Sequence, residues 1–200
     1  DEALLCYEAA LIFSLAPAQL AHVHFLIGRT LVRSDRRTEA LGHFDQALKI
    51  NPDHPDYRGA AFKNLICLGD ADFEAGRWNE AMQSYKTALV ISLDPDQLAR
   101  THFLIGRTLA KSDRRAEAVN HFGLALTIKP DQHDYRSAAF KNLKGLGDAN
   151  FEAGKRDEAV QSYKTALAIS VDPDQLARAH FLIGRTLTKA DRRVEAADHF

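Results

Sequence analysis

Six histidines recur in this sequence at a fixed spacing, and three of them stand in a segment that also carries an arginine. The eight residues HFLIGRTL occupy 24–31, 102–109 and 180–187, so they place a histidine at His24, His102 and His180. A second histidine follows each of these along the chain, at His43, His121 and His199. Paired imidazoles can bind zinc or copper, and they titrate near neutral pH. The repeated segment therefore indicates either a reused site or the packing rule of a repeating fold.

The packing interpretation is favoured for the histidines. Two antiparallel helices would bring each pair close together, but two nitrogen ligands fall short of the four that a structural zinc site takes. We therefore expect core or boundary histidines whose titration makes the packing mildly pH-sensitive. The sequence also has no glycine-rich phosphate loop and no nucleophile with a recurring base. We predict no metal site, no cofactor and no enzymatic activity.

Composition excludes several classes of partner. With 26 basic and 27 acidic side chains, the net charge of −1 does not favour nucleic acid or an anionic membrane. Cys6 and Cys67 are too few for a disulfide framework, which fits a reducing compartment, and we expect a cytoplasmic location. The most apolar stretch, residues 3–16, is too short for a membrane span and contains Glu8. We expect neither nucleic acid nor a membrane as a partner.

HFLIGRTL belongs to a longer repeat. Its phenylalanine returns every 78 residues, and segment 57–122 is identical to segment 135–200 at about three quarters of positions. Each 78-residue unit divides again, with a glycine, an alanine twelve residues later and an aromatic residue four further on. The glycines are Gly28, Gly69, Gly106, Gly147 and Gly184, and the aromatic residues are Phe44, Tyr85, Phe122, Tyr163 and Phe200. Such a pattern indicates helices that approach closely at small residues, with an aromatic ring filling the space beside each contact.

The order glycine, alanine, aromatic, alanine, proline resembles the tetratricopeptide repeat (TPR) family over essentially the whole chain. The resemblance implies an all-α, right-handed α-solenoid of stacked antiparallel helix pairs, a superhelix of about five repeats. Helix starts are expected at Pro95, with Asp94 as the N-cap, and after Ser112 or Asp113 as the next cap.

A single array over 1–200 is expected, incomplete at both ends. Its expected parts are the second helix of a truncated repeat (1–16), four repeats (17–53, 54–94, 95–131 and 132–172) and an incomplete repeat (173–200).

In TPR proteins the first helix of each pair lines a concave groove, and the resemblance carries this role over to particular positions. The groove would carry alternating basic and acidic stripes, with phenylalanines on the basic helices. The implied peptide-binding residues are Phe25, Arg29, Arg33, Lys63, Asp70, Glu74, Phe103, Arg107, Lys111, Lys141, Asp148, Phe181, Arg185 and Lys189.

Two interpretations of these charges stay open. In one, arginines and lysines grip the carboxylates of an extended peptide, and its apolar residues meet phenylalanine. In the other, Arg29, Asp70 and Arg107 form a charge ladder and satisfy one another. Phe25 and Phe103 stand where chaperone-binding TPR domains have lysine, and Asn64 and Asn142 lie off the asparagine position. We therefore do not expect chaperone-tail binding.

The sequence predicts a non-catalytic scaffold that binds an extended peptide or a partner helix, with another protein, possibly acidic, as the partner. Two alternatives come from other classes. The array could be a structural spacer or a rod that self-associates end to end, since its units are nearly identical. It could also be the substrate-recruiting arm of a larger enzyme, such as a glycosyltransferase or a kinase.

Overall fold

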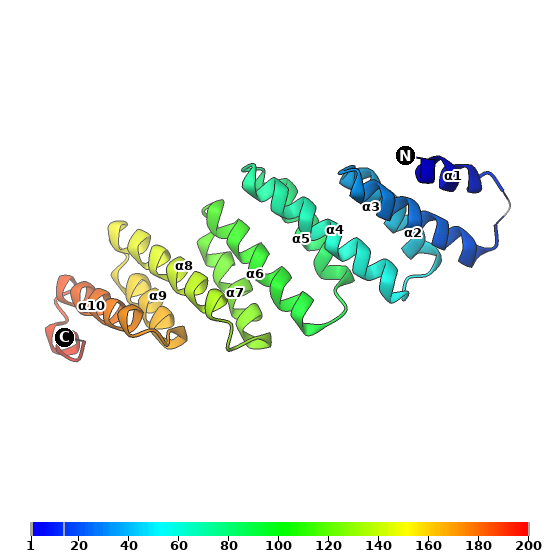
Figure 1. The fold of residues 1–200 in the computed structure, drawn as a ribbon. Helices are drawn as coiled ribbons and strands as arrows, with labels where there is room; N and C mark the ends of the chain where they lie inside the picture. The colour runs from blue at the N-terminus through cyan, green and yellow to red at the C-terminus, as the bar shows by residue number, and fades with distance from the viewer. Residues whose placement is uncertain (1, 14, 200) are drawn as a thin grey trace. The chain divides into compact units, whose positions relative to one another are not determined.

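The computed structural model describes residues 2–13 and 15–199, and over these residues the chain is built from helices joined by short turns, without a strand (Figure 1). The predicted all-α TPR solenoid of antiparallel helix pairs is confirmed. The helices are α1 (Glu2–Ala10), α2 (Pro17–Arg33), α3 (Arg37–Ile50), α4 (Pro55–Glu74), α5 (Trp78–Ile91), α6 (Pro95–Lys111), α7 (Arg115–Ile128), α8 (His133–Glu152), α9 (Arg156–Ile169), α10 (Pro173–Lys189) and α11 (Arg193–Ala197).

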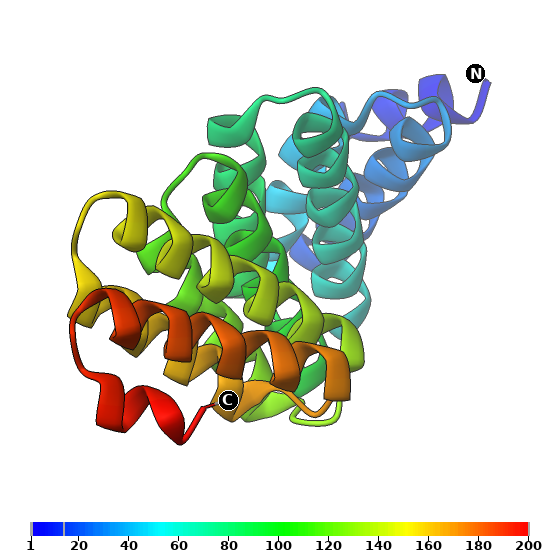
Figure 2. The same cartoon turned by 90° about the vertical axis from the view of Figure 1, so that its left-hand side faces the viewer.

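The chain forms two compact units, with the boundary between Thr101 and His102 inside α6. In the N-terminal unit the helices from α1 to α5 pack in sequence, α1 against α2, α2 against α3, α3 against α4 and α4 against α5. In the C-terminal unit α7 to α11 do the same, and α8 and α10 lie side by side, in yellow and orange in Figure 2. Within each unit these helices therefore pack against their neighbours in sequence, as expected for a repeat array. The division into repeats stays a prediction.

Glycines set the distance between the two helices of a pair. A Cβ atom at Gly28 would stand 2.7 Å from the ring of Phe44, and one at Gly69 would stand 2.4 Å from the ring of Tyr85. Gly106 and Gly147 face Phe122 and Tyr163 in the same way. A ring this close leaves no room for a side chain, which is why the glycine and the aromatic residue recur in register.

Of the two helix caps predicted from the sequence, the one before α6 forms and the one before α7 does not. Asp94 accepts a hydrogen bond from the Gln97 amide at 2.8 Å, so its predicted role as an N-cap is confirmed. The prediction that Ser112 or Asp113 caps α7 is wrong, because Arg114 is the N-cap residue and makes no side-chain cap. Asp113 instead adopts a left-handed backbone conformation, with φ at 60°. That conformation ends the preceding helix and lets the Arg114 amide donate to the Leu109 carbonyl at 2.9 Å.

Among the described residues, no helix combines the length and the apolar character that crossing a membrane would require.

Candidate peptide-binding groove

A groove runs between α2 and α4 in the N-terminal unit. One part of it, about 520 Å³, is lined by Phe25, Arg29, Asp56 and Lys63. A second part of about 290 Å³ shares Arg29 and Lys63 and continues past them. It is also lined by Arg33, Arg37, Asn64 and Cys67. The helical period explains this lining, because residues three and four positions apart on one helix share a face.

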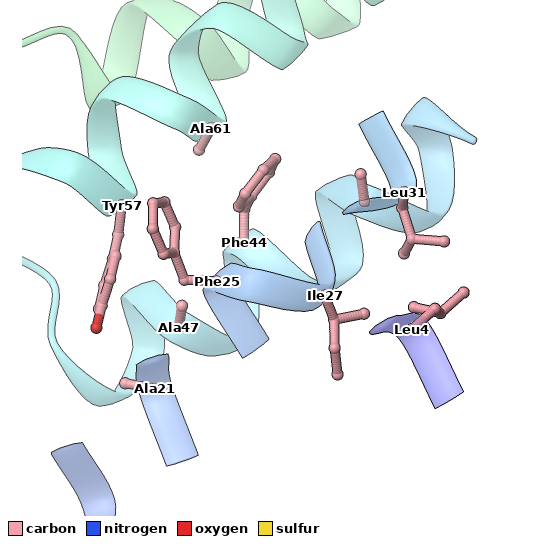
Figure 3. Packing of buried hydrophobic residues seen from close by; sticks show 10 residues of the cluster. Leu4, Ala21, Phe25, Ile27, Leu31, Phe44, Ala47, Tyr57 and Ala61 are labelled. Atoms are coloured by element: carbon pink, nitrogen blue, oxygen red, sulfur yellow. The ribbon is translucent and has the colours of Figure 1, made fainter. Parts of the chain in front are cut away.

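Aromatic residues form the floor of the groove. Phe25 is only 8% exposed, and its ring lies between Tyr57 and Phe44, as Figure 3 shows. The ring centroids of Phe25 and Tyr57 are 4.9 Å apart. The Arg29 guanidinium lies over the Phe25 ring, 5.4 Å from its centroid. Phe25 therefore offers only an edge to a ligand, while Arg29 above it is exposed.

The corresponding residues of the C-terminal unit are arranged similarly. Phe103 stacks on Tyr135 with a centroid distance of 4.5 Å, and the Arg107 guanidinium lies 5.9 Å from the Phe103 centroid. Phe181 differs, since 55% of it is exposed. The exposure of the predicted groove phenylalanines thus differs widely, from the buried Phe25 to the exposed Phe181.

Cations dominate the groove of the N-terminal unit. Arg33 and Lys63 are exposed and form no ion pair with any residue that the structure describes. Arg37 pairs with Asp35, with 3.1 Å between Nε and Oδ1. At the equivalent positions of the C-terminal unit stand Lys111 and Lys141, both exposed, and Arg115, which pairs with Asp113 at 3.1 Å. A basic lining is therefore present at the corresponding positions of both units.

Two acidic residues of the predicted groove, Asp70 and Asp148, make contacts within the chain. Asp70 accepts a hydrogen bond from the Tyr85 hydroxyl at 2.6 Å. Asp148 accepts one from the Tyr163 hydroxyl at 2.8 Å and pairs with Lys144 at 2.5 Å. The two tyrosine contacts tie the two helices of a pair together through the ring that fills the glycine gap. Asp70 and Asp148 are thus partly used for structure, while Glu74, Glu152 and Lys189 lie on the surface.

Partial burial opposes ionisation of Asp148, but hydrogen bonds from Lys144 and Tyr163 outweigh it and lower the pKa of this carboxyl. Burial and the hydrogen bond to Asp148 both raise the pKa of Tyr163. Arg185, on α10, also lowers the pKa of Asp148 by its charge. Arg185 itself lies over the Phe151 ring, 4.5 Å from its centroid.

Asn64 and Arg37 also line the groove of the N-terminal unit, although the family resemblance does not place them there. The Asn64 amide donates to the Arg37 carbonyl at 2.9 Å, and Asn142 donates to the Arg115 carbonyl at the same distance. Both asparagines are buried. Their recurrence with the 78-residue period was the available signal, but the interaction joins one pair to the next and is visible only in three dimensions.

The histidine pairs form as expected. The Nδ1 atoms of His24 and His43 are 3.1 Å apart, those of His102 and His121 3.1 Å, and those of His180 and His199 3.0 Å. A glutamate recurs four residues before the second histidine, but Glu39 is held by Arg36 through two hydrogen bonds of 2.6 and 2.7 Å. In the part of the chain that the structure describes, no group of three or more His, Cys, Asp or Glu side chains gathers as metal ligands would.

Known proteins show the same repeat. Tetratricopeptide repeat models match residues 21–54, 99–132 and 143–177, which together make up just over half of the chain. The DnaJ homolog subfamily C member 7 homolog of Schizosaccharomyces pombe is 27% identical over 184 residues. That alignment covers 88% of this chain and 36% of the relative, so the chain spans about a third of that protein's length.

Solved TPR structures are similar at low sequence identity. YrrB, described as a TPR protein with an unusual peptide-binding site, is 18% identical with a TM-score of 0.47, over 90% of this chain and 82% of YrrB. MamA is 21% identical with a TM-score of 0.45, over 91% of this chain and 88% of MamA. With the family models matching three segments across both units, the chain belongs to the tetratricopeptide repeat family.

Proposed function

We propose that this chain is a non-catalytic scaffold that binds an extended peptide or a partner helix in the groove lined by the first helix of each pair. TPR folds serve in general as protein–protein interaction scaffolds. The observation that carries the finer proposal is the groove between α2 and α4, where Arg33 and Lys63 are exposed cations beside an aromatic floor. Cations without carboxylate partners, next to apolar surface, suit a peptide with acidic and hydrophobic residues.

The proposed contacts are of two kinds. In the N-terminal unit Arg29, Arg33 and Lys63 would meet the acidic residues of a peptide, and Phe25 its apolar residues. In the C-terminal unit Arg107, Lys111 and Lys141 would meet acidic residues, and Phe103 and Phe181 apolar ones. Asp70 and Asp148 would contribute less, because tyrosine hydroxyls already donate to them. The partner is another protein, since the net charge of −1 gives no general attraction for nucleic acid.

Charge reversal at the groove tests this proposal. Peptides selected from a random library on the wild-type chain would be titrated against two double variants, Arg33→Glu/Lys63→Glu in the N-terminal unit and Arg107→Glu/Lys111→Glu in the C-terminal unit. We expect affinity to fall by about tenfold or more, which corresponds to ~1.4 kcal/mol. The matched control is Lys86→Glu/Lys155→Glu, which makes the same change in net charge at exposed residues outside the groove.

Two other results would contradict binding in the groove. Equal binding by both groove variants and the control would show that the peptide lies on another surface. A chain that selects no peptide and instead associates with itself as its concentration rises, measured by light scattering, would support the structural rod.

A further inference from the structure

The two rings of each histidine pair point their Nδ1 atoms at each other. Within a pair the ring centroids are 5.2 to 5.3 Å apart, and the Nδ1 atoms are 3.0 to 3.1 Å apart. The difference is close to twice the radius of an imidazole ring, so both nitrogens lie near the line that joins the centroids. Since a nitrogen lone pair points away from the centre of its ring, the two lone-pair positions of a pair face each other along one line.

This line offers two ligands and no more. In the part of the chain that the structure describes, no third His, Cys, Asp or Glu side chain joins a pair as a metal ligand. Zinc takes four ligands in a tetrahedron, and a chelated divalent ion needs two lone pairs that converge at an angle. Imidazole also suits copper, and a monovalent copper ion takes two nitrogens on opposite sides. The expectation of no metal site followed from the ligand count of zinc, and it does not apply to an ion of this kind.

We propose that each histidine pair binds one Cu⁺ ion between its two Nδ1 atoms. The first pair is His24 and His43, and the third pair is His180 and His199. With metal–nitrogen bonds of about 2 Å, as in zinc–histidine sites, a linear ion holds the two nitrogens about 4 Å apart. The rings of the first pair must therefore separate by about 1 Å from their distance of 3.1 Å, which small side-chain rotations supply. All six side chains are half-buried, so an ion reaches them from solvent.

Binding at a pair is balanced in protons and electrons. In the free, neutral pair one ring carries its proton on Nδ1 and the other ring on Nε2. In the complex both rings carry the proton on Nε2, because both Nδ1 lone pairs bind the ion. One proton moves through water from Nδ1 to Nε2 of the same ring, none is released, and copper stays monovalent. Two metal–nitrogen bonds replace one hydrogen bond between the helices, so binding stabilises the folded chain.

Nearby charges rank the pairs in affinity. Burial lowers the pKa of His43 and the charge of Glu8, on α1, opposes this, so a carboxylate acts on the first pair. Lys164, on α9, stands at the position equivalent to Glu8 beside the third pair. Burial, the partner histidine and then this ammonium lower the pKa of His199. A carboxylate attracts a cation and an ammonium repels it, so the first pair is expected to bind Cu⁺ more tightly than the third.

A chain without cysteines tests the proposal, because exposed thiols also bind Cu⁺. Cys6→Ser/Cys67→Ser removes both thiols, which are exposed. This chain is titrated with Cu⁺ in the absence of oxygen, against a coloured Cu⁺ chelator. Three ions are expected per chain, one for each pair.

Histidine variants of the cysteine-free chain locate the ions. His24→Gln/His43→Gln is expected to lower the number bound by one ion. The matched control is His22→Gln/His133→Gln, which removes two exposed histidines outside the pairs and should leave the number unchanged. Melts monitored by circular dichroism check that each variant folds, and added Cu⁺ is expected to raise the Tm of the control and of the parent chain.

Charge and coordination are measured separately. In a chain that also carries His102→Gln/His180→Gln, only the first pair remains, and Glu8→Lys is expected to weaken its binding by about threefold or more. X-ray absorption at the copper edge is expected to show two nitrogen neighbours on one line, without oxygen or sulfur. This spectrum is recorded on the cysteine-free chain with all of its histidines, so it decides the coordination even if a histidine variant unfolds.

Three results would overturn the proposal. If His24→Gln/His43→Gln and its control take up equal numbers of ions, copper is bound outside the pairs. Three or four ligands in the X-ray absorption spectrum would exclude a two-coordinate ion. Zn²⁺ that binds the same pairs as tightly as Cu⁺ would assign them to a divalent ion that completes its ligand set with water. Peptide binding in the groove is a separate proposal, and none of these results bears on it.

Discussion

The Nδ1 atom of His24 lies 3.1 Å from the Nδ1 atom of His43, and this contact joins the two helices of one pair. A hydrogen bond between two imidazole nitrogens needs a proton on one and a free lone pair on the other. The pair can therefore hold one extra proton, but a second one would place two N–H groups against each other. His102–His121 and His180–His199 repeat the arrangement, so the chain carries three contacts that acid should break.

The first prediction concerns stability against pH. Burial, with the charge of His43, lowers the pKa of His24. Burial also lowers the pKa of His43, and this effect outweighs the opposite effect of the charges of Glu8 on α1 and Glu39 on α3. The unfolded chain, with a pKa of about 6.5 for histidine, then binds more protons than the folded chain. Stability is therefore fully present above about pH 6.5 and falls as the pH drops below that value.

Thermal melts between pH 8 and pH 5 measure this effect. His24→Gln/His43→Gln is expected to reduce the loss of Tm on acidification by a few °C, since ~1 kcal/mol corresponds to about 2–4 °C in a chain of this size. His133→Gln is the control, because the His133 side chain is exposed and lies near Asp134, 4.0 Å away, and not near a second histidine of the repeated pairs. If the double variant and the wild type lose Tm equally, the histidine pair does not control the acid response.

The second prediction concerns the close approach at the glycines. Gly69→Ala would place a Cβ 2.4 Å from the Tyr85 ring, so overpacking should cost about 1–3 kcal/mol. Gly42→Ala lies in a helix with nothing within 4 Å of the new Cβ, and it should stabilise by about 0.4–1 kcal/mol. Urea unfolding of both variants gives the comparison. A destabilisation of equal size at both positions would show that the ring contact is not the cause.

The third prediction concerns the pKa of Asp148, whose carboxylate accepts a hydrogen bond from the Tyr163 hydroxyl. Tyr163→Phe removes the hydroxyl that donates to Asp148 at 2.8 Å, so the pKa of Asp148 should rise toward its usual value. The Lys144 ammonium remains, at 2.5 Å, and keeps part of the lowering. An NMR titration of the Asp148 carboxyl measures the shift. The control is Tyr7→Phe, a half-buried tyrosine in the other unit, which should leave this pKa unchanged.

Much of the fold follows from the sequence because it depends on spacing along one chain. The glycine and aromatic positions fix the contact within a pair, and Asp94 before Pro95 fixes a helix start. The histidine pairing also follows, since two antiparallel helices must bring His24 and His43 to the same level. These relationships repeat with the period of the chain and need no knowledge of the neighbouring pair.

The details of the groove do not follow in the same way. The resemblance assigns Phe25 to the groove lining, but its depth there depends on Tyr57 of the next pair, whose ring lies against it. Asn64 lies off the asparagine position of chaperone-binding TPR domains, yet it lines the pocket and donates to the Arg37 carbonyl. Ser112 and Asp113 fit an N-cap by residue type, whereas the backbone needed a left-handed residue at Asp113. Each case depends on a contact between elements or on a backbone angle, which residue type alone does not determine.

The last prediction uses that left-handed turn. Gly154 has φ at 78° and Gly76 has φ at 74°, at the turn positions where Asp35, Asp113 and Asp191 have φ between 58° and 60°. A side chain in this region costs roughly 1–2 kcal/mol, and aspartate and asparagine tolerate it better because their side chains can hydrogen-bond locally. A Cβ at Gly154 would meet nothing within 4 Å, so a substitution there reports on the backbone angle alone.

Gly154→Ala is therefore expected to destabilise the chain by about 1 kcal/mol, and Gly154→Asn by clearly less. The reverse change, Asp113→Gly, should be close to neutral, because the relief of backbone strain is offset by the larger entropy of glycine in the unfolded chain and by loss of the Asp113–Arg115 pair. Urea unfolding of the three variants measures these differences. Equal destabilisation by alanine and asparagine at residue 154 would contradict the assignment, since only the left-handed conformation distinguishes the two side chains in an open site.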